Sequence, residues 1–168
     1  MYKWVYKTNE TLDDIILISD GEYLTDLHFI NSDNDLKKYE NIKVKELDIF
    51  NQTCKWLDIY FSGKNPDFVP RYKLYNVTPF VNEIIKILVT IPYGETMTYG
   101  EIAKIIADNR KIKKMSSQGV GQGVGNNPIC IIIPCHRVLG KNNKITGYSG
   151  GLNNKKFLLD LENIKYIL

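Results

Sequence analysis

The first sixty residues alternate short apolar runs with polar turns, a pattern typical of a small α/β unit. Residues 2–8 alternate weakly, and residues 14–20 contain the run Ile-Ile-Leu-Ile. Asp20-Gly21 then leads into a second β-like segment, residues 22–30. Two such runs joined by Asp-Gly predict an antiparallel hairpin. The polar residues 31–41 predict a loop.

A helix and an extended segment are expected next. Between residues 46 and 61 the apolar residues recur at helical spacing, namely at Leu47, Phe50, Cys54, Leu57 and Phe61. Gly63 is a suitable stop for this helix. Pro66 and Pro70 predict an extended linker over about residues 64–77.

We therefore expect two domains, residues 1–75 and residues 78–168, separated at this linker. Thr78-Pro79 opens the second domain with a helix cap and a proline at the first helical position. Thr98-Tyr99-Gly100-Glu101 is a capping box that opens a helix over residues 99–108.

A basic loop and a third segment complete the outline of a helix-turn-helix. The loop spans residues 110–114, and Ser116 or Ser117 can cap residues 118–125. This segment has glycine at every second position, and each interior glycine costs a helix about 1 kcal/mol relative to alanine. The segment is therefore either a loop or a helix freed of bulk so that its backbone approaches a ligand closely. We favour the helix, docked in a DNA minor groove.

Charge is unevenly distributed along the chain. The net charge of the 168 residues is +3. Residues 1–60 carry 7 basic and 12 acidic side chains, whereas residues 61–168 carry 15 and 7. The asymmetry is compatible with a polyanion facing the second half, although an ordinary uneven surface would have the same composition.

Cysteine and histidine content argues against a metal site. Cys54, Cys130 and Cys135 form no disulfide framework, and with only His28 and His136 beside them they lack zinc-site spacing. We expect no metal, no cofactor and a reducing cytoplasm. No apolar segment approaches the length that spans a membrane, and the first residues do not resemble a secretory signal.

The most informative segment is Ile131-Ile132-Ile133-Pro134-Cys135-His136-Arg137-Val138. A thiol is nucleophilic as thiolate, and a neighbouring imidazole makes thiolate available near neutral pH. The alternative is a small buried cysteine at the end of a core strand. Chemistry alone leaves both interpretations open.

The order of several motifs resembles the methylated-DNA–protein-cysteine methyltransferases, also called O6-alkylguanine-DNA alkyltransferases. The matching blocks are Ile91-Pro92-Tyr93-Gly94-Glu95-Thr96, Thr98-Tyr99-Gly100-Glu101-Ile102-Ala103, Val120-Gly121, Asn127-Pro128, Ile133-Pro134-Cys135-His136-Arg137-Val138, Gly147-Tyr148, Gly150-Gly151, and Leu158-Leu159 with Glu162. The resemblance covers about residues 53–162. It implies an α+β protein: a small ribonuclease-H-like α/β domain, then a mostly helical domain with a helix-turn-helix.

The resemblance also implies an activity. The family takes a methyl or larger alkyl group from O6 of guanine in DNA onto its own cysteine, once and irreversibly; O4 of thymine is a second candidate substrate. Cys135 would be the acceptor, His136 its base through a water, and Glu162 the group that orients the imidazole. Tyr99 would protonate the leaving guanine. Asn127 would brace the turn between the recognition helix and the active-site strand.

Substrate contacts follow from the same resemblance. The expected guanine pocket comprises Val124, Val138, Tyr148, Ser149 and Gly150. The expected DNA contacts are Thr98, Tyr99, Lys113, Lys114, Ser116, Ser117, Gln118, Gly119, Gly121, Gln122, Gly123 and Arg137. For Arg137 a structural ion pair is the more natural role.

The target base must leave the duplex before a side chain reaches its O6 atom, at a cost of a few kcal/mol. Family members fill the vacancy with an arginine, and the matching residue here is Gln118, which lacks the charge and planar fork of guanidinium. We expect a monomer that binds double-stranded DNA through the minor groove. We do not expect it to bind a membrane. The alternatives are a lesion binder without chemistry, a cysteine hydrolase, and a helix-turn-helix regulator.

Overall fold

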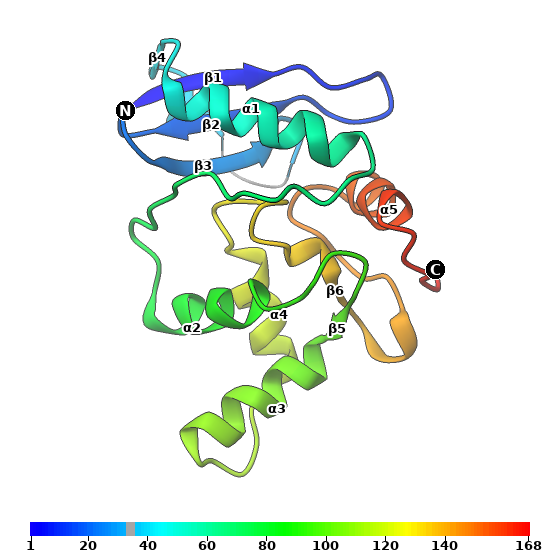
Figure 1. Cartoon of the computed structure of the whole chain (residues 1–168). Helices are drawn as coiled ribbons and strands as arrows, with labels where there is room; N and C mark the ends of the chain where they lie inside the picture. The colour runs from blue at the N-terminus through cyan, green and yellow to red at the C-terminus, as the bar shows by residue number, and fades with distance from the viewer. Residues whose placement is uncertain (33–35) are drawn as a thin grey trace.

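The computed structural model describes residues 1–32 and 36–168. The N-terminal part holds a four-stranded sheet in the order β3-β2-β1-β4, with α1 across one face (Figure 1). Its elements are β1 (Tyr2–Tyr6), β2 (Ile15–Ser19), β3 (Leu24–Phe29), the short 3₁₀ helix η1 (Lys37–Tyr39), β4 (Lys43–Val44) and α1 (Asp48–Phe61). The predicted loop 31–41 thus contains a helical turn, and its residues 33–35 lie outside the described part.

The predicted hairpin is confirmed. β2 and β3 pair antiparallel, with Ile15 opposite Phe29 and Leu17 opposite Leu27. The Asp20 carboxylate accepts hydrogen bonds from the backbone N–H groups of Glu22 at 2.9 Å and Tyr23 at 2.8 Å. Gly21 has φ of +115°, a conformation that side chains rarely adopt. The Asp-Gly pair therefore makes the turn by a local mechanism.

The C-terminal part is mostly helical. Its elements are α2 (Pro79–Leu88), β5 (Met97–Thr98), α3 (Tyr99–Arg110), α4 (Ser117–Gly125), η2 (Cys135–Arg137), β6 (Val138–Leu139), η3 (Lys141–Asn143) and α5 (Leu152–Leu161). The predicted caps are present: Thr78 for α2, a complete capping box from Thr98 for α3, and Ser116 for α4. The glycine-rich segment is therefore a helix.

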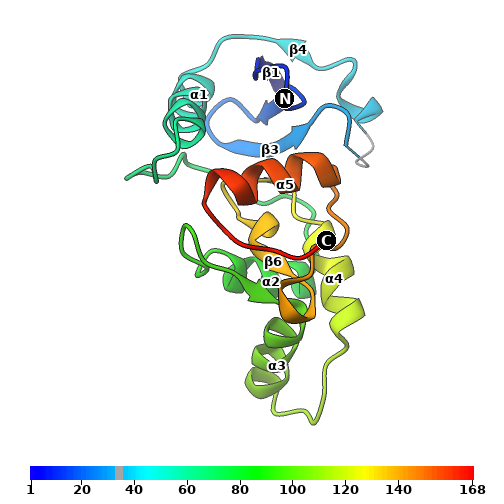
Figure 2. The same ribbon diagram turned by 90° about the vertical axis from the view of Figure 1, so that its right-hand side faces the viewer.

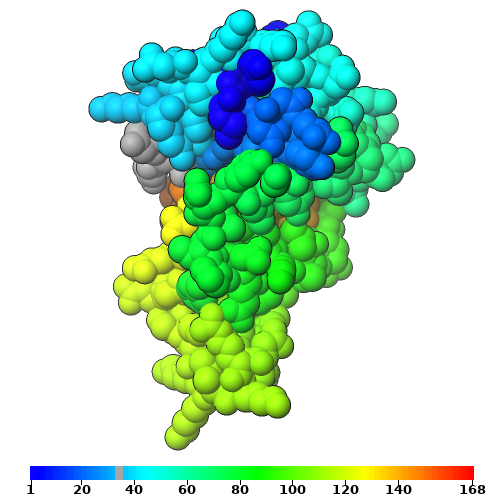
Figure 3. Space-filling model, turned by 90° about the vertical axis from the view of Figure 1, so that its left-hand side faces the viewer, coloured from blue at the N-terminus to red at the C-terminus, as the bar shows by residue number. Residues whose placement is uncertain are grey.

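A helix-turn-helix is formed by α3 and α4, which contact each other and α2. α3 continues two residues past the expected end, to Arg110, and Lys111 closes it in the left-handed conformation. The loop that follows α3 lies at the far end of the elongated molecule from the sheet (Figure 3).

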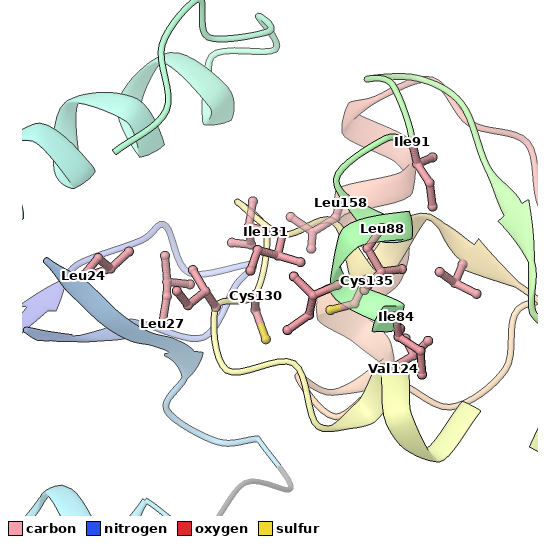
Figure 4. Close-up of a cluster of buried hydrophobic side chains, with 14 of the residues drawn as sticks. Leu24, Leu27, Ile84, Leu88, Ile91, Val124, Cys130, Ile131, Cys135 and Leu158 are labelled. Carbon is pink, nitrogen blue, oxygen red and sulfur yellow. The ribbon is translucent and has the colours of Figure 1, made fainter. Parts of the chain in front are cut away.

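The two parts share one hydrophobic core. The edge strand β3 makes two isolated parallel bridges, one from Leu24 to Tyr72 and one from Leu27 to Ile129. In the second bridge, the Leu27 N–H donates to Pro128 O at 2.9 Å, and the Cys130 N–H donates to Leu27 O at 3.0 Å. Figure 4 shows Leu24 and Leu27 in the same cluster as Cys130 and Cys135. In Figure 2, α5 lies beneath β3, against the rest of the C-terminal part. The sheet thus holds the cysteine-bearing segment directly.

The active-site strand that the family resemblance implied is absent. Residues 130–133 form turns, and Ile131 has φ of +69°, which interrupts an extended chain. Cys135 instead begins η2. In the described part of the chain, no helix is long and apolar enough to cross a lipid bilayer.

Candidate functional site

Cys135 lies at the floor of a cavity with only 2% of its surface exposed. Its Sγ is 4.0 Å from the Tyr148 hydroxyl. The pKa of Cys135 is lowered to about 7, chiefly by a hydrogen bond from the Cys130 thiol and further by Asn127, Tyr148 and Lys155, and these effects outweigh burial. A substantial fraction of this thiol is therefore thiolate near neutral pH.

His136 is completely buried behind the thiol and faces Glu162. Its Nε2 is 2.7 Å from Glu162 Oε1. Among the described residues, its Nδ1 has no hydrogen-bond partner. Burial lowers the pKa of His136 despite the neighbouring carboxylate, so the imidazole is neutral at physiological pH. A neutral imidazole with one free nitrogen is a general base.

Glu162 is surrounded by hydrogen-bond donors. Arg137 donates through Nε at 2.9 Å to Oε2 and through Nη2 at 3.0 Å to Oε1. The Gly94 N–H donates to Oε2 at 3.0 Å, and the Tyr60 hydroxyl donates to Oε1 at 2.7 Å. Burial alone would raise the pKa of Glu162, but His136 and Arg137 hold it far below its ordinary value. The carboxylate is thus charged at physiological pH.

Arg137 does not fit its expected place among the DNA contacts. Its side chain is 10% exposed, and its Nη1 donates to Ile91 O at 2.8 Å while the rest of the guanidinium holds Glu162. Each of its three nitrogens donates a hydrogen bond inside the protein. The ion-pair role is the one that the geometry supports.

Asn127 braces the turn that leads to Cys135. Its Nδ2 donates to Ile133 O at 2.8 Å, and its Oδ1 accepts from the Ile129 N–H at 3.1 Å. The side chain is buried. These bonds satisfy backbone groups that would otherwise pair in a strand, which explains why the apolar run remains irregular.

Lys155 was not anticipated from the sequence. It is fully buried, and its Nζ donates to Val138 O at 2.7 Å, with Gly147 O at 3.5 Å. Burial lowers the pKa of Lys155 to about 8, although Cys135 works to raise it. Its position three and four residues before Leu158 and Leu159, on the apolar face of α5, was the available signal.

A cavity of about 840 Å³ opens above the thiol. Its walls come from the start of α3, one side of α4 and the loop after β6. The residues that line it are Thr98, Tyr99, Gly100, Ser117, Gln118, Gly121, Gln122, Val124, Gly125, Cys135, Gly140, Lys141, Asn142, Thr146, Gly147, Tyr148 and Ser149. Ten of these were expected. No sequence motif indicated Gly140, Lys141 and Asn142, which lie at the start of η3.

Tyr99 and Tyr148 present hydroxyl groups at this cavity. Thr146 Oγ1 donates to the Tyr99 hydroxyl at 3.3 Å. Burial raises the pKa of Tyr99, and burial together with Cys135 raises that of Tyr148 further. Both phenols therefore keep their protons and remain hydrogen-bond donors at physiological pH.

The glycines of α4 lie on two faces rather than one. Gly121 and Gly125 face the cavity, where a Cβ on Gly121 would make ordinary contact with the Tyr99 ring. Gly123 is buried against α2: its Cβ would lie 2.3 Å from Ile84 Cδ1. This glycine therefore allows α4 and α2 to pack closely, which explains its presence without a DNA contact. Gly119 lies beside it, one turn earlier, next to Ser116.

Two expected pocket residues lie behind the cavity wall. Val138 is fully buried, and its carbonyl already accepts from Lys155, which leaves one lone pair for another donor. Gly150 is packed between the Tyr148 and Phe29 rings and accepts from Asn154 Nδ2 at 2.7 Å. Lys113 and Lys114 are exposed on the loop after α3, away from the cavity lining.

Comparisons with known proteins agree with this architecture. The family description "6-O-methylguanine DNA methyltransferase, ribonuclease-like domain" matches residues 1–69, and "6-O-methylguanine DNA methyltransferase, DNA binding domain" matches residues 79–164. A methylated-DNA–protein-cysteine methyltransferase of Methanosarcina mazei is 42% identical over 148 residues, covering 88% of this chain and 89% of the relative. One from Haemophilus influenzae is 39% identical over 153 residues, covering 91% and 82%.

A solved structure gives the same result. The OGT of Mycobacterium tuberculosis, crystallised in complex with DNA, superposes with a TM-score of 0.80 at 34% identity and covers 96% of this chain and 92% of that chain. The chain belongs to the 6-O-methylguanine DNA methyltransferase family. It is a DNA-repair enzyme of the methylated-DNA–protein-cysteine methyltransferase class, with a ribonuclease-like domain and a DNA-binding domain.

Proposed function

We propose that the chain repairs DNA by moving a methyl or other alkyl group from O6 of guanine to Sγ of Cys135. The S–C bond forms as the O6–C bond breaks. The thiol proton passes through a water to His136 Nδ1, and the guanine anion takes a proton from Tyr99. A thioether does not hydrolyse under physiological conditions, so each molecule reacts once.

The observation that carries the proposal is the buried thiol with a pKa near 7 in front of the His136–Glu162 pair. The lowered pKa supplies the nucleophile. The unpartnered Nδ1 supplies the proton acceptor, and the charged Glu162 keeps the imidazole oriented. Tyr99 is a suitable acid because its raised pKa keeps it protonated until the guanine anion forms.

The depth of the thiol supports base flipping. With 2% exposure, Sγ cannot reach an O6 atom that is stacked in a duplex. We infer that the nucleotide rotates into the cavity from the minor groove, with Gln118 and Gln122 of α4 at its rim. Lys113, Lys114, Ser116 and Ser117 would contact phosphates. O4 of thymine is a second substrate of the same geometry.

The assembly and setting follow from the same chemistry. One chain holds the thiol, the base and the cavity, so we propose that the protein acts as a monomer. Because the reaction needs a free thiol, we propose a reducing cytoplasm. Residues 78–168 would carry DNA binding and alkyl transfer, and residues 1–75 would support them.

Mass spectrometry tests the proposal directly. After incubation with an oligonucleotide duplex containing O6-methylguanine, the peptide with Cys135 is expected to gain one methyl group. Cys135→Ser should abolish the transfer. Cys54→Ser, at a half-buried thiol remote from the cavity, should leave it intact. An unmodified Cys135 with repeated turnover would indicate a hydrolase, and DNA binding without either product would indicate a lesion binder.

A further inference from the structure

Tyr60 reaches the site from the other domain. It lies near the end of α1, is fully buried, and donates its hydroxyl hydrogen to Glu162 Oε1 at 2.7 Å. The same hydroxyl lies 3.3 Å from His136 Nε2. Trp56 stacks on the ring at 5.3 Å between centroids, and Tyr93 contacts it edge-on at 6.1 Å. The ring is thus held independently of its hydroxyl.

The contacts among the Tyr60 hydroxyl, Glu162 Oε1 and His136 Nε2 determine which imidazole nitrogen carries the hydrogen. Burial, and then Glu162, raise the pKa of Tyr60 well above its ordinary value, so the phenol stays protonated and directs its hydrogen at the carboxylate. His136 Nε2 faces this carboxylate and the phenol oxygen, both of which accept. Nε2 must therefore carry the hydrogen, and Nδ1 is left as the acceptor.

We propose that Tyr60 is a positioning residue for the alkyl transfer, which fixes the tautomer and basicity of His136 through Glu162. This inference rests on the role of His136 proposed above. It gives the N-terminal domain a part in the chemistry, because α1 supplies one of the donors that hold the relay. Tyr60 touches neither the substrate nor the thiol in this arrangement.

The direction in which loss of the Tyr60 hydroxyl shifts the pKa of His136 can be predicted. The groups that face His136 are Glu162, Arg137, Lys155 and the Tyr60 hydroxyl. The phenol withdraws negative charge from Oε1, and its removal leaves a more negative oxygen, 2.7 Å from Nε2, that stabilises the imidazolium. This effect outweighs the loss of the phenol oxygen as an acceptor for Nε2, because that contact is longer, at 3.3 Å. The pKa of His136 then rises. The transfer rate falls at low pH because His136 becomes protonated, and this fall, the acid limb of the pH profile, moves to higher pH.

The test compares Tyr60→Phe with Tyr93→Phe in the full chain, using single-turnover transfer from an O6-methylguanine duplex across pH. Tyr93 is a neighbouring phenol whose buried hydroxyl has no hydrogen-bond partner among the described residues. For Tyr60→Phe we expect a rate lowered roughly tenfold at neutral pH, an acid limb at higher pH and unchanged DNA affinity. Tyr93→Phe should match the unmodified protein.

The outcomes separate the two proposals. A rate and acid limb equal to those of the unmodified protein would overturn the role of Tyr60, as would a slower rate with an unshifted limb, which signals a structural role. An unmodified protein that never methylates Cys135 would instead overturn the proposed function. Nitrogen NMR of the unmodified protein gives a check that needs no variant: His136 protonated on Nδ1 rather than Nε2 contradicts the inference.

Discussion

Buried charge at single residues sets the chemistry of this site. Lys155 is inside the protein beside the thiol, and it holds the Val138 carbonyl at 2.7 Å. A buried ammonium stabilises a nearby thiolate more strongly than an exposed one, because water screens it less. Lys155 is therefore one reason that the pKa of Cys135 falls to about 7.

Replacing this lysine should weaken the nucleophile. In Lys155→Met we expect the pKa of Cys135 to rise, so that carboxamidomethylation of Cys135 by iodoacetamide, followed by peptide mass spectrometry, shifts to higher pH. Lys156→Met, at the adjacent and more exposed position, is the matched control. An unchanged pH midpoint in folded Lys155→Met would show that the ammonium does not act on the thiol.

Gln118 is the residue at which this chain departs from the arginine that the family resemblance implies. It lines the cavity rim, where it can hydrogen-bond an orphaned cytosine without offering a charge. Gln118→Arg should accelerate transfer from a fully paired duplex and change transfer from a mismatched one little, as measured in single-turnover assays. Gln122→Arg, one turn further along the rim, controls for added charge. Equal acceleration by both variants would exclude a role specific to position 118.

Among the elements, α4 packs against α2 on one face and lines the cavity on another. Gly123 permits contact with α2, whereas Gly125 has open space around its Cβ position. Gly123→Ala should destabilise the protein by about 1–3 kcal/mol through overpacking against Ile84. Gly125→Ala should stabilise it by up to about 1 kcal/mol through helix propensity. Urea unfolding measures the free energy of unfolding of the two variants. Equal changes in this free energy would contradict the placement of Gly123 and Gly125 on different faces of α4.

The elements that local interactions specify were predictable from the sequence. Thr78, Thr98 and Ser116 each accept a hydrogen bond from a backbone N–H three residues on. The starts of α2 and α3 were therefore predicted at the correct residues, and α4 begins at Ser117, one residue before the predicted start. The expected strand before Cys135 was wrong because Asn127 and the edge of β3 fix that segment. Such contacts between distant segments leave no local pattern.

The same limit applies to the site. Cys135 and His136 are adjacent in the sequence, and this pairing indicated that Cys135 is the candidate nucleophile. Tyr60 is 102 residues from Glu162, and its sequence context indicated only a buried helix face. The structure alone shows that Tyr60, His136 and Arg137 all contact the Glu162 carboxylate.

At the scale of the whole molecule, positive charge lies at the end that is proposed to meet DNA. The exposed basic loop after α3 is far from the acidic N-terminal half (Figure 3). Replacing Lys113 and Lys114 together by alanine should reduce the magnitude of the slope of log Kd against log salt by about 2. Replacing the exposed Lys43 and Lys64 should leave the slope unchanged, as judged by fluorescence anisotropy. Identical slopes in both double variants would place the phosphate contacts elsewhere.

The number of methyl groups that each chain accepts shows whether Cys135 is the single, irreversible acceptor. The protein is titrated against a tenfold excess of duplex that carries an isotope-labelled methyl group on O6 of guanine. We predict that labelled protein rises in a single phase and stops at one methyl per chain, with all of the label on Cys135. Continued loss of methyl from the DNA beyond one per chain, or label on any other residue, would show that Cys135 is not a single-use acceptor.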